Sequence, residues 1–182
     1  KSDDSNHSFD ASYDVEYTLT EKDTPFGYNT ADNIVFKVVD DVLYKRNPDN
    51  TWAAVDSIVM TDAALDTCSF DVSKVSAGQG NELEGATLII SEHDTVDEAK
   101  DDYIKSWVSD GSAKEFALPI GEYYLYEISA PAGFEVAESI RFRVTDEYAL
   151  QVYDEDEGDF VDAEDAKLTM VDDYNPDETT TF

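Results

Sequence analysis

Short runs in which apolar and polar residues alternate fill most of the chain after residue 67. Successive side chains of a β-strand point to opposite faces, so this period of two is typical of half-buried strands. Turn residues, for example Asp110 and Gly111, separate the runs. Helical periodicity is nearly absent, and only residues 94–103 fit a short acidic helix or a loop. This is the pattern of an antiparallel sandwich or barrel, and we predict an all-β sandwich. The predicted strands are 68–75, 86–92, 103–109, 114–118, 122–129, 138–145, 149–153 and 167–173.

An internal repeat organises the chain. Residues 17–28 are similar to residues 123–134, and Glu21 then matches Glu127 at an offset of 106 positions. An alternating strand and a closing segment follow in both copies: 33–39 matches 139–145, and 57–62 matches 167–172. A repeat of this length indicates one structural module per copy.

The two copies are not equally complete. Residues 67–176 hold a whole module, whereas residues 1–63 hold only the C-terminal half of one. The intervening linker, about 63–66, is too short for loose tethering. We therefore predict Ig-like β-sandwich modules in tandem, one complete and one partial, with 177–182 as a linker.

The charge balance excludes two classes of partner. The chain carries 43 Asp and Glu against 12 Lys and Arg, a net charge of −31. Such a field repels nucleic acid and anionic membrane surfaces. No apolar run approaches membrane-spanning length, and the first residues lack the apolar core of a signal peptide, so we expect a mature or excised piece. The single cysteine, Cys68, allows no internal disulfide and is predicted to be a core residue.

Three charged residues lie in the inward phase of predicted strands: Lys74, Glu127 and Asp172. Each follows two apolar residues of the same face, namely Phe70 and Val72, Tyr123 and Leu125, and Leu168 and Met170. Burial of an isolated charge is costly, so these three side chains are expected to meet in one buried cluster.

Two interpretations of this cluster remain open from spacing alone. The first is a buried ion network, which gives little net stability because desolvation offsets much of the attraction. The second is covalent: burial favours a neutral Lys74 amine, a nucleophile, and a protonated Asp172 carboxyl, an electrophile. Glu127 would then relay protons, and an isopeptide bond would join the first and last strands.

Three separated motifs carry a family resemblance. They are 72–74 followed by 82–86, Glu127 followed by 130–134, and 170–176. In this order they resemble the reactive-lysine strand, the catalytic-glutamate strand and the closing strand of the collagen-adhesin B-type repeats. These SpaA-like, prealbumin-like domains belong to Gram-positive surface proteins and pilins, and the segment is most similar to the parent domain of SpyTag and SpyCatcher.

The resemblance implies a fold and a role. It implies prealbumin-like modules with an autocatalytic isopeptide bond between Lys74 and Asp172, and with Glu127 as the catalytic proton relay. The family partner is often Asn, so Asp172 implies loss of water in place of ammonia. The protein would be a structural stalk of an extracellular, cell-wall-anchored adhesin or pilin, not an enzyme with turnover, and would need no cofactor or metal. Its partners would be neighbouring modules of the same surface protein and, in a ligand-binding role, a host extracellular ligand.

The partial module has two of the three reactive positions. Glu21 and Asp62 lie in the same inward phase as Glu127 and Asp172, but the matching lysine is absent from this chain. No lysine of residues 1–63 ends an apolar half-strand as Lys74 does. We expect the missing N-terminal half, with its lysine, to come from polypeptide not in this sequence. The competing interpretation is a degenerate half-module that packs on the complete one and never cross-links.

Two other functions remain as alternatives. One is a ligand-binding adhesin module whose loops at 93–102 or 154–166 contact a host protein or glycan. The other is an accessory domain of a secreted glycan-degrading enzyme. The acidic run 154–165 breaks the spacing of an EF-hand calcium loop and is interpreted as a solvated charge run. His7 and His93 stand in polar stretches and are not expected to bind metal; the tryptophans, Trp52 and Trp107, are expected to pack.

Overall fold

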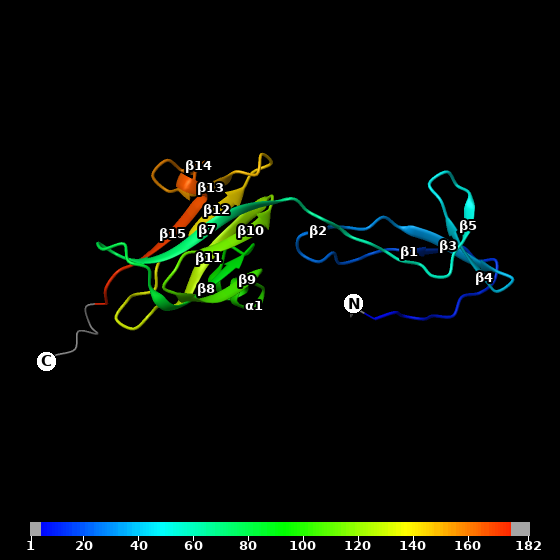
Figure 1. The fold of residues 1–182 in the computed structure, drawn as a ribbon, viewed down its shortest axis with the longest axis horizontal. Coiled ribbons are helices and arrows are strands. Elements are labelled where there is room, and N and C mark those ends of the chain that lie inside the picture. Colours follow the sequence, from blue (N-terminus) through cyan, green and yellow to red (C-terminus); the bar gives the residue numbers. More distant parts are fainter. Residues whose placement is uncertain (1–4, 176–182) are drawn as a thin grey trace. The chain divides into compact units, whose positions relative to one another are not determined.

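The computed structural model describes residues 5–175 and divides the chain into two compact units, Lys1–Leu65 (unit 1) and Asp66–Phe182 (unit 2). The predicted linker 177–182 lies outside the described residues. Each unit is built from β-strands, and Figure 1 shows their order along the chain.

Unit 2 is a sandwich of two sheets. One sheet has three strands in the order β10-β7-β15, and the other has six in the order β14-β13-β12-β11-β8-β9. The strands are β7 (Thr67–Ser76), β8 (Glu84–Ser91), β9 (Lys105–Asp110), β10 (Lys114–Pro119), β11 (Gly121–Ser129), β12 (Ile140–Val144), β13 (Leu150–Asp154), β14 (Asp159–Asp162) and β15 (Lys167–Asp172). The predicted all-β sandwich is confirmed, and the eight predicted strands are all present to within two residues at each end. The prediction that it is antiparallel is wrong for one pair, because β15 pairs with β7 in parallel.

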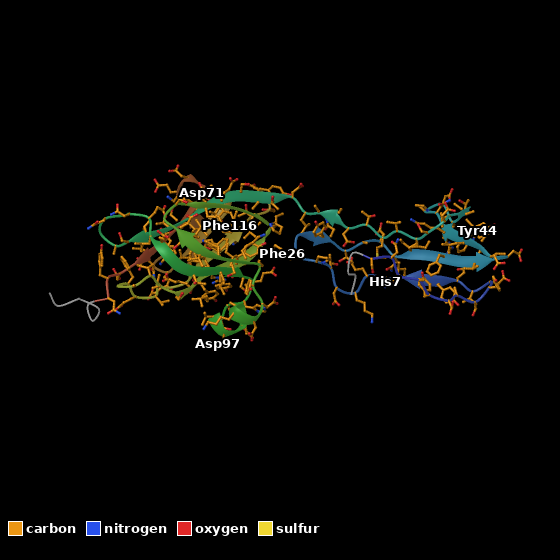
Figure 2. All side chains as sticks on the ribbon, turned by 60° about the horizontal axis from the view of Figure 1, so that its bottom comes forward. His7, Phe26, Tyr44, Asp71, Asp97 and Phe116 are labelled. Atoms are coloured by element: carbon orange, nitrogen blue, oxygen red, sulfur yellow. The ribbon has the colours of Figure 1, made fainter. Side chains whose placement is uncertain are left out.

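The inward phases of these strands form one apolar core. Phe70 packs edge-on against Phe142 with ring centroids 5.6 Å apart, and Trp107 packs on Phe116 at 4.6 Å. Figure 2 shows Phe116 within this packed layer of side chains. Cys68 is buried at its edge, as predicted, and burial raises the pKa of its thiol. The alternation in the sequence therefore corresponds to a core that the inner faces of the two sheets form together.

Helix α1 (Val96–Asp101) resolves the ambiguity of residues 94–103. Two acidic residues occupy its first turn, where the helix dipole favours negative charge. Its Ala99 is fully buried with Ile89 and Tyr126, which belong to the outward faces of β8 and β11. The helix thus covers part of the outer face of the six-stranded sheet with a small second core.

Strand β14 was not predicted. It lies in the acidic run, where the period of two is hidden by flanking carboxylates. Phe160 and Val161 pair with Tyr153 and Val152 of β13, and the Arg143 guanidinium lies 4.2 Å from the centre of the Phe160 ring. Pairing with β13 and this cation–π contact stabilise residues 159–162 as a strand, although the acidic composition alone predicts an exposed loop there.

Unit 1 is a single four-stranded sheet with one additional strand pair. The sheet order is β1-β3-β4-β5, and β2 pairs with β6. The strands are β1 (Tyr17–Leu19), β2 (Tyr28–Asn29), β3 (Ile34–Val39), β4 (Val42–Arg46), β5 (Trp52–Ala54) and β6 (Ala63–Ala64). At the offset of the repeat, β1, β3, β4 and β5 correspond to β11, β12, β13 and β14 of unit 2. Within residues 5–65, Ile34 and Phe36 are the only buried apolar side chains.

The closing segment of unit 1 departs from its counterpart. Residues 57–62 match β15 in sequence, but the structure assigns them to no strand. Ile58, Met60 and Asp62 are still half-buried while Ser57, Val59 and Thr61 are exposed, so the side chains keep the alternation of a strand. In unit 2, β15 forms its ladder with β7, and residues 5–65 contain no counterpart of β7. The segment lacks the hydrogen-bonding partner that a strand requires.

Candidate cross-linking site

Lys74 and Asp172 are brought together by a parallel strand pair. In the β7–β15 register Lys74 is opposite Met170, and Asp172 is opposite Ser76. Lys74 and Asp172 are therefore two positions apart on the same inward face, a diagonal that a lysine side chain can span. β7 is the central strand of its sheet, between β10 and β15, which fixes the lysine backbone on both sides.

Glu127 approaches from the opposite sheet. It lies near the end of β11, and the β11–β8 register shifts by one residue between Glu127 and Ser129. Such bulges redirect a side chain locally. The backbone N–H of Ala137 donates to Glu127 Oε2 at 2.7 Å, which fixes one carboxylate oxygen and leaves Oε1 toward the lysine.

The three side chains form one buried cluster, as the sequence phase predicts. Lys74 Nζ is in direct contact with Asp172 Oδ1 and lies 3.2 Å from Glu127 Oε1. The exposed fractions are 2% for Lys74, 4% for Glu127 and 0% for Asp172. Val72 and Met170, which belong to the main core, lie on the same strands as Lys74 and Asp172.

Burial changes the acid–base behaviour of the lysine. Desolvation lowers the pKa of Lys74, and the Glu127 carboxylate opposes this shift by favouring the ammonium form. Loss of hydration is the larger of the two effects, because the amine has no access to water. The neutral amine, which is the nucleophilic form, is thus easier to reach than on an exposed lysine.

Two buried oxygens are left without a hydrogen-bond partner in residues 5–175, and both belong to this cluster: Glu127 Oε1 and Asp172 Oδ2. Glu127 Oε1 lies at ion-pair distance from Lys74 Nζ but is not aligned for a hydrogen bond. A stable ion network normally satisfies every such atom, since an unsatisfied buried oxygen is costly.

A supporting contact was not recognised as such in the sequence. Glu82 follows the turn after β7 and folds back on it: Ser73 Oγ donates to Glu82 Oε1 at 2.6 Å, and the Lys74 backbone N–H donates to Oε2 at 3.2 Å. The only sign of this contact in the sequence is the acidic residue itself, eight positions after Lys74. This clasp holds the backbone of the lysine without touching its amine.

The counterparts in unit 1 are only partly assembled. Glu21 Oε2 accepts the Ala31 backbone N–H at 2.9 Å, the equivalent of the Glu127–Ala137 bond. Asp62 interacts with Glu21: partial burial raises the pKa of Asp62, and the charge of Glu21 and a hydrogen bond between the carboxyls add to the shift. Both side chains are half-buried, and no lysine of residues 5–65 forms an ion pair with them.

The other candidate residues are apart from this site. His7 and His93 lie in different units, and His93 Nε2 is 3.2 Å from Asp102 Oδ2. Lys37 Nζ lies 4.3 Å from the centre of the Trp52 ring, so Trp52 packs within its own unit. No group of three or more potential ligands that could hold a metal ion is found in residues 5–175, the acidic run included.

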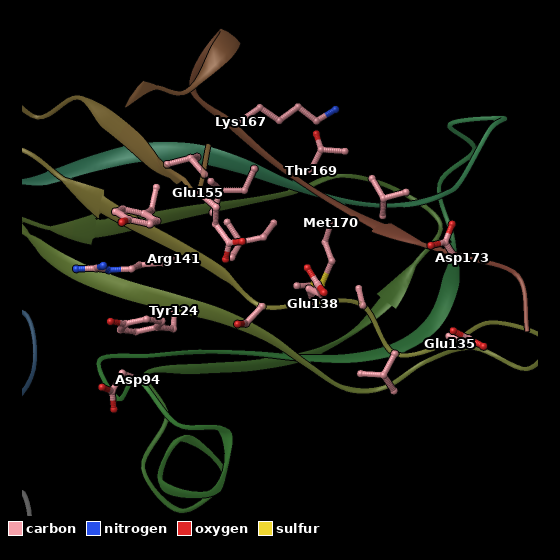
Figure 3. A pocket seen from close by; sticks show the side chains of 18 residues that line it. Asp94, Tyr124, Glu135, Glu138, Arg141, Glu155, Lys167, Thr169, Met170 and Asp173 are labelled. Carbon is pink, nitrogen blue, oxygen red and sulfur yellow. The ribbon is translucent and has the colours of Figure 1, made fainter. Parts of the chain in front are cut away.

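A groove opens in unit 2 beside β12 and β15. Its volume is about 1060 Å³. Figure 3 shows Tyr124 and Arg141 on one side and Lys167 and Thr169 of β15 on the other. Asp94 and Glu155 also line it, one from each of the two loops that the sequence marks as possible ligand contacts.

Comparisons with known proteins agree on the fold. A model of the SpaA prealbumin-like fold domain matches residues 68–158, half of the 182 residues; the matched region includes Lys74 and Glu127. No curated protein matches the chain. The described part contains no helix that is both long and apolar enough to cross a membrane.

Solved structures of two pilus adhesins are similar to the chain. The adhesin SpaC from Lactobacillus rhamnosus GG, in its open conformation, is 15% identical over 87% of this chain, with a TM-score of 0.53. The pilus-presented adhesin Spy0125 (Cpa) is 26% identical over 53% of this chain, with a TM-score of 0.44. The chain spans only 24% and 21% of these two structures. The SpaC similarity supports the fold, and with the domain match it confirms the resemblance found in the sequence: the chain belongs to the SpaA family of prealbumin-like fold domains.

Proposed function

We propose that this chain is a structural module of a bacterial surface adhesin or pilus, and that unit 2 is cross-linked internally by an isopeptide bond between Lys74 and Asp172. The observation that carries the proposal is the buried contact of Lys74 Nζ with Asp172 Oδ1, with Glu127 Oε1 3.2 Å from the same nitrogen. Glu127 is the proton relay of the reaction.

The reaction is a condensation that balances without a cofactor. The neutral Lys74 amine attacks Cγ of the protonated Asp172 carboxyl, and a C–N bond forms. Glu127 accepts a proton from the nitrogen and returns one to the departing oxygen. The C–O bond to that oxygen breaks, and one molecule of water leaves.

The reaction happens once in each molecule. The amine and the carboxyl are both consumed, and neither is regenerated, so the chain is not an enzyme that turns over a substrate. Burial supplies the catalysis: it favours the two neutral reactants, and the fold holds them in contact.

The cross-link suits a part that bears load. It closes a loop of 98 residues between the first and last strands of the unit. A pull on the two ends of unit 2 would pass through this bond and leave the hydrogen bonds of the sheets unloaded. We therefore assign the module to an extracellular, cell-wall-anchored stalk whose partners are neighbouring modules of the same surface protein. That SpaC and Spy0125 are pilus adhesins supports this assignment.

Intact mass spectrometry tests the bond. The wild-type chain should be lighter than its sequence mass by one molecule of water, and a fragment joining residues 74 and 172 should survive digestion. The variants Lys74→Ala and Glu127→Ala should each show the full mass of their own sequence. Lys105→Ala, at an exposed lysine of β9, is the matched control and should keep the deficit. A wild-type mass equal to the sequence mass would show that Lys74, Glu127 and Asp172 form an ion network and no covalent bond.

A ligand-binding module is the second candidate, and the groove beside β15 favours it. The groove combines Arg141 and Lys167 with carboxylates from both candidate loops, so it offers paired charges to a host protein or glycan. Binding of the wild-type chain to a panel of matrix proteins and glycans, compared with Lys167→Ala, separates this role from that of a pure stalk. Binding that Lys167→Ala removes would favour the ligand-binding role.

A further inference from the structure

One edge of β15 is left unpaired beside the groove of unit 2. We propose that this groove binds an extended, basic segment of another protein, which adds to the β10-β7-β15 sheet as a fourth strand. The proposal rests on the ligand-binding role given above as the second candidate, and it names the chemistry of the partner. It is independent of the cross-link.

Every second residue of β15 points its backbone groups toward this open edge. Among residues 5–175, β15 pairs with β7 alone. The Ala77 N–H donates to the Asp172 carbonyl at 2.8 Å, so the backbone of Asp172 faces β7. In a parallel ladder the N–H and C=O groups of alternate residues point to opposite sides, and those of Thr169 and Val171 therefore point away from β7. Such unpaired groups are a template for a further strand.

The groove opens where two neighbouring segments separate. At its closed end the Glu135 N–H donates to the Asp173 carbonyl at 2.9 Å, and Figure 3 shows both residues at this end. From Glu135 the chain leaves β15 and joins β11, where Ile140 pairs with Leu125. The edge is thus covered just beyond β15 by the chain itself. The groove continues this covered position along the strand.

The size and the lining of the groove suit an extended segment. Its volume of about 1060 Å³ is at the upper limit of ordinary small-ligand pockets, which is about 1,000 Å³. Consecutive residues of β15, 167–171, line it, as expected of a groove that follows a strand edge. Val136 and Val171 also line it and are 56% and 49% exposed, so an added strand would cover apolar surface.

The charge of the groove favours a basic segment. Its exposed carboxylates are those of Asp94, Glu135, Glu138, Glu155 and Asp173. Against them stand Arg141 and Lys167. Arg141 is already engaged, because its Nε donates to Glu122 Oε1 at 2.6 Å. The groove therefore carries an excess of negative charge, which attracts lysine and arginine side chains of a partner.

The partner is a different protein and not a second copy. At a net charge of −31, two copies of this chain repel one another. The adjacent cations Lys45 and Arg46 lie on β4, and Arg141 and Arg143 lie on β12; both are inner strands that cannot be offered to another sheet. A glycan lacks the alternating N–H and C=O groups that would continue the ladder. A peptide backbone provides them, with affinity from the main chain and specificity from the side chains.

Unit 1 has a groove at the equivalent position but without these two features. It is lined by 31–35 and 59–61, the counterparts of 137–141 and 169–171, and has a volume of about 580 Å³. Two cationic side chains and one carboxylate line it, and 59–61 form no strand. A basic strand should therefore bind to unit 2 and not to unit 1.

A short labelled peptide in which lysine alternates with valine is the probe, and it is titrated into the full-length chain. We expect saturable binding that weakens with added salt, together with protection of the Thr169 and Val171 amides from hydrogen exchange. A peptide with glutamate in place of lysine should not bind. The lysine peptide N-methylated at every backbone nitrogen should bind about 10-fold more weakly or worse, because it cannot form the ladder.

Variants of the chain test the edge and the charge separately. Thr169→Pro removes the N–H that faces the groove and keeps the ladder to β7, and it should weaken binding by about 10-fold. Glu135→Gln and Glu138→Gln should each weaken it by about 2- to 5-fold. Glu147→Gln, at an exposed position outside the groove, is the matched control and should bind as the wild type does. Lys167→Ala should bind at least as tightly, because it removes a cation.

The proposal is overturned if the lysine peptide does not bind, or if the glutamate peptide or the N-methylated peptide binds equally well. It is also overturned if Thr169→Pro binds as tightly as the wild type. If Thr169→Pro fails to fold, the comparison of the peptides on the wild-type chain decides. A glycan that binds and is lost with Lys167→Ala, in the absence of peptide binding, would retain the ligand-binding role and overturn the strand. The intact mass of the same samples reports the bond between Lys74 and Asp172, so failure of docking is distinguishable from failure of the cross-link.

Discussion

The two units present the same half-module in two environments. Unit 2 contains the four strands β11 to β14 together with β7, β8, β9, β10 and β15, whereas residues 5–65 contain only the counterparts of the first four, with one further strand pair. Any feature shared by both units is determined by the repeated sequence itself. Any feature found only in unit 2 requires the additional strands.

The shared features are local. Tyr17 stacks on Phe36 and Tyr123 packs on Phe142, in both cases with ring centroids 5.5 Å apart. Lys37 lies over Trp52 as Arg143 lies over Phe160. The backbone bond that orients the glutamate is also present in each unit. The four-stranded sheet and the orientation of the glutamate, Glu21 or Glu127, are therefore properties of the half-module.

The differences concern burial and the reactive carboxyl. Glu127 and Asp172 are excluded from solvent, whereas Glu21 and Asp62 are half-buried. The closing strand is formed in unit 2 only, where it has β7 beside it. The burial of the carboxyls in unit 2 is thus supplied by strands that have no counterpart in residues 5–65.

The largest expected effect is loss of the proposed cross-link in unit 2. Lys74→Ala should leave the sandwich folded but lower its free energy of unfolding by about 4–5 kcal/mol, the entropy of closing a loop of about 100 residues, if the bond acts as a disulfide does. The resistance of unit 2 to heat and to trypsin should then fall toward that of unit 1. Unit 1 is expected to be cut first, for example at Lys22 and Arg46. The control is Lys105→Ala. Equal resistance of Lys74→Ala and wild type would show that the bond has another role.

The next effect compares two leucines at matching positions. Leu125→Ala removes a fully buried side chain from a closed core and should cost about 3–5 kcal/mol. Leu19→Ala removes a half-buried one and should cost about 1 kcal/mol. Denaturation followed separately by Trp107 in unit 2 and Trp52 in unit 1 measures both. Equal costs would mean that the inward face of unit 1 is already closed.

These comparisons also show what the sequence could predict. The strands of unit 2 follow from alternation because each has a partner and a core face. The same alternation in 57–62 predicts a strand that does not form, because strand propensity depends on a neighbouring strand. Lys74, Glu127 and Asp172 could be selected because each ends an apolar half-strand, which is a local signal. The bulge beside Glu127 and the clasp of Glu82 on Ser73 depend on tertiary contacts and carry no local periodicity.

A smaller effect concerns the cation–π pair that both units contain. Lys37→Gln and Arg143→Gln should each cost roughly 0.5–1 kcal/mol in their own unit. Arg143→Gln should cost the more of the two, since Arg143 Nε also donates to Gln151 Oε1 at 2.7 Å. Chemical denaturation with the two tryptophan signals measures the difference, and Lys22→Gln at an exposed position is the control. A larger loss for Lys37→Gln would show that unit 1 depends on this contact more than unit 2 does.

The smallest expected effect is a pH dependence confined to unit 1. Burial and Glu21 raise the pKa of Asp62 in the folded state above its unfolded value of about 3.9. The folded state therefore holds this proton more tightly, and the resulting stability is fully present below about pH 4 and is lost as the pH rises through the raised pKa. Unit 1, followed by Trp52 in a Trp107→Phe background, should become slightly easier to denature over this range. Asp62→Asn should remove the trend and Glu21→Gln should reduce it, whereas Asp56→Asn should leave it unchanged. Unit 2 should show no equivalent fall, because the proposed cross-link consumes the Asp172 carboxyl. If the pH dependence survives Asp62→Asn, another group is responsible for it. The interaction between the Asp62 and Glu21 carboxyls would then have no measurable effect on stability.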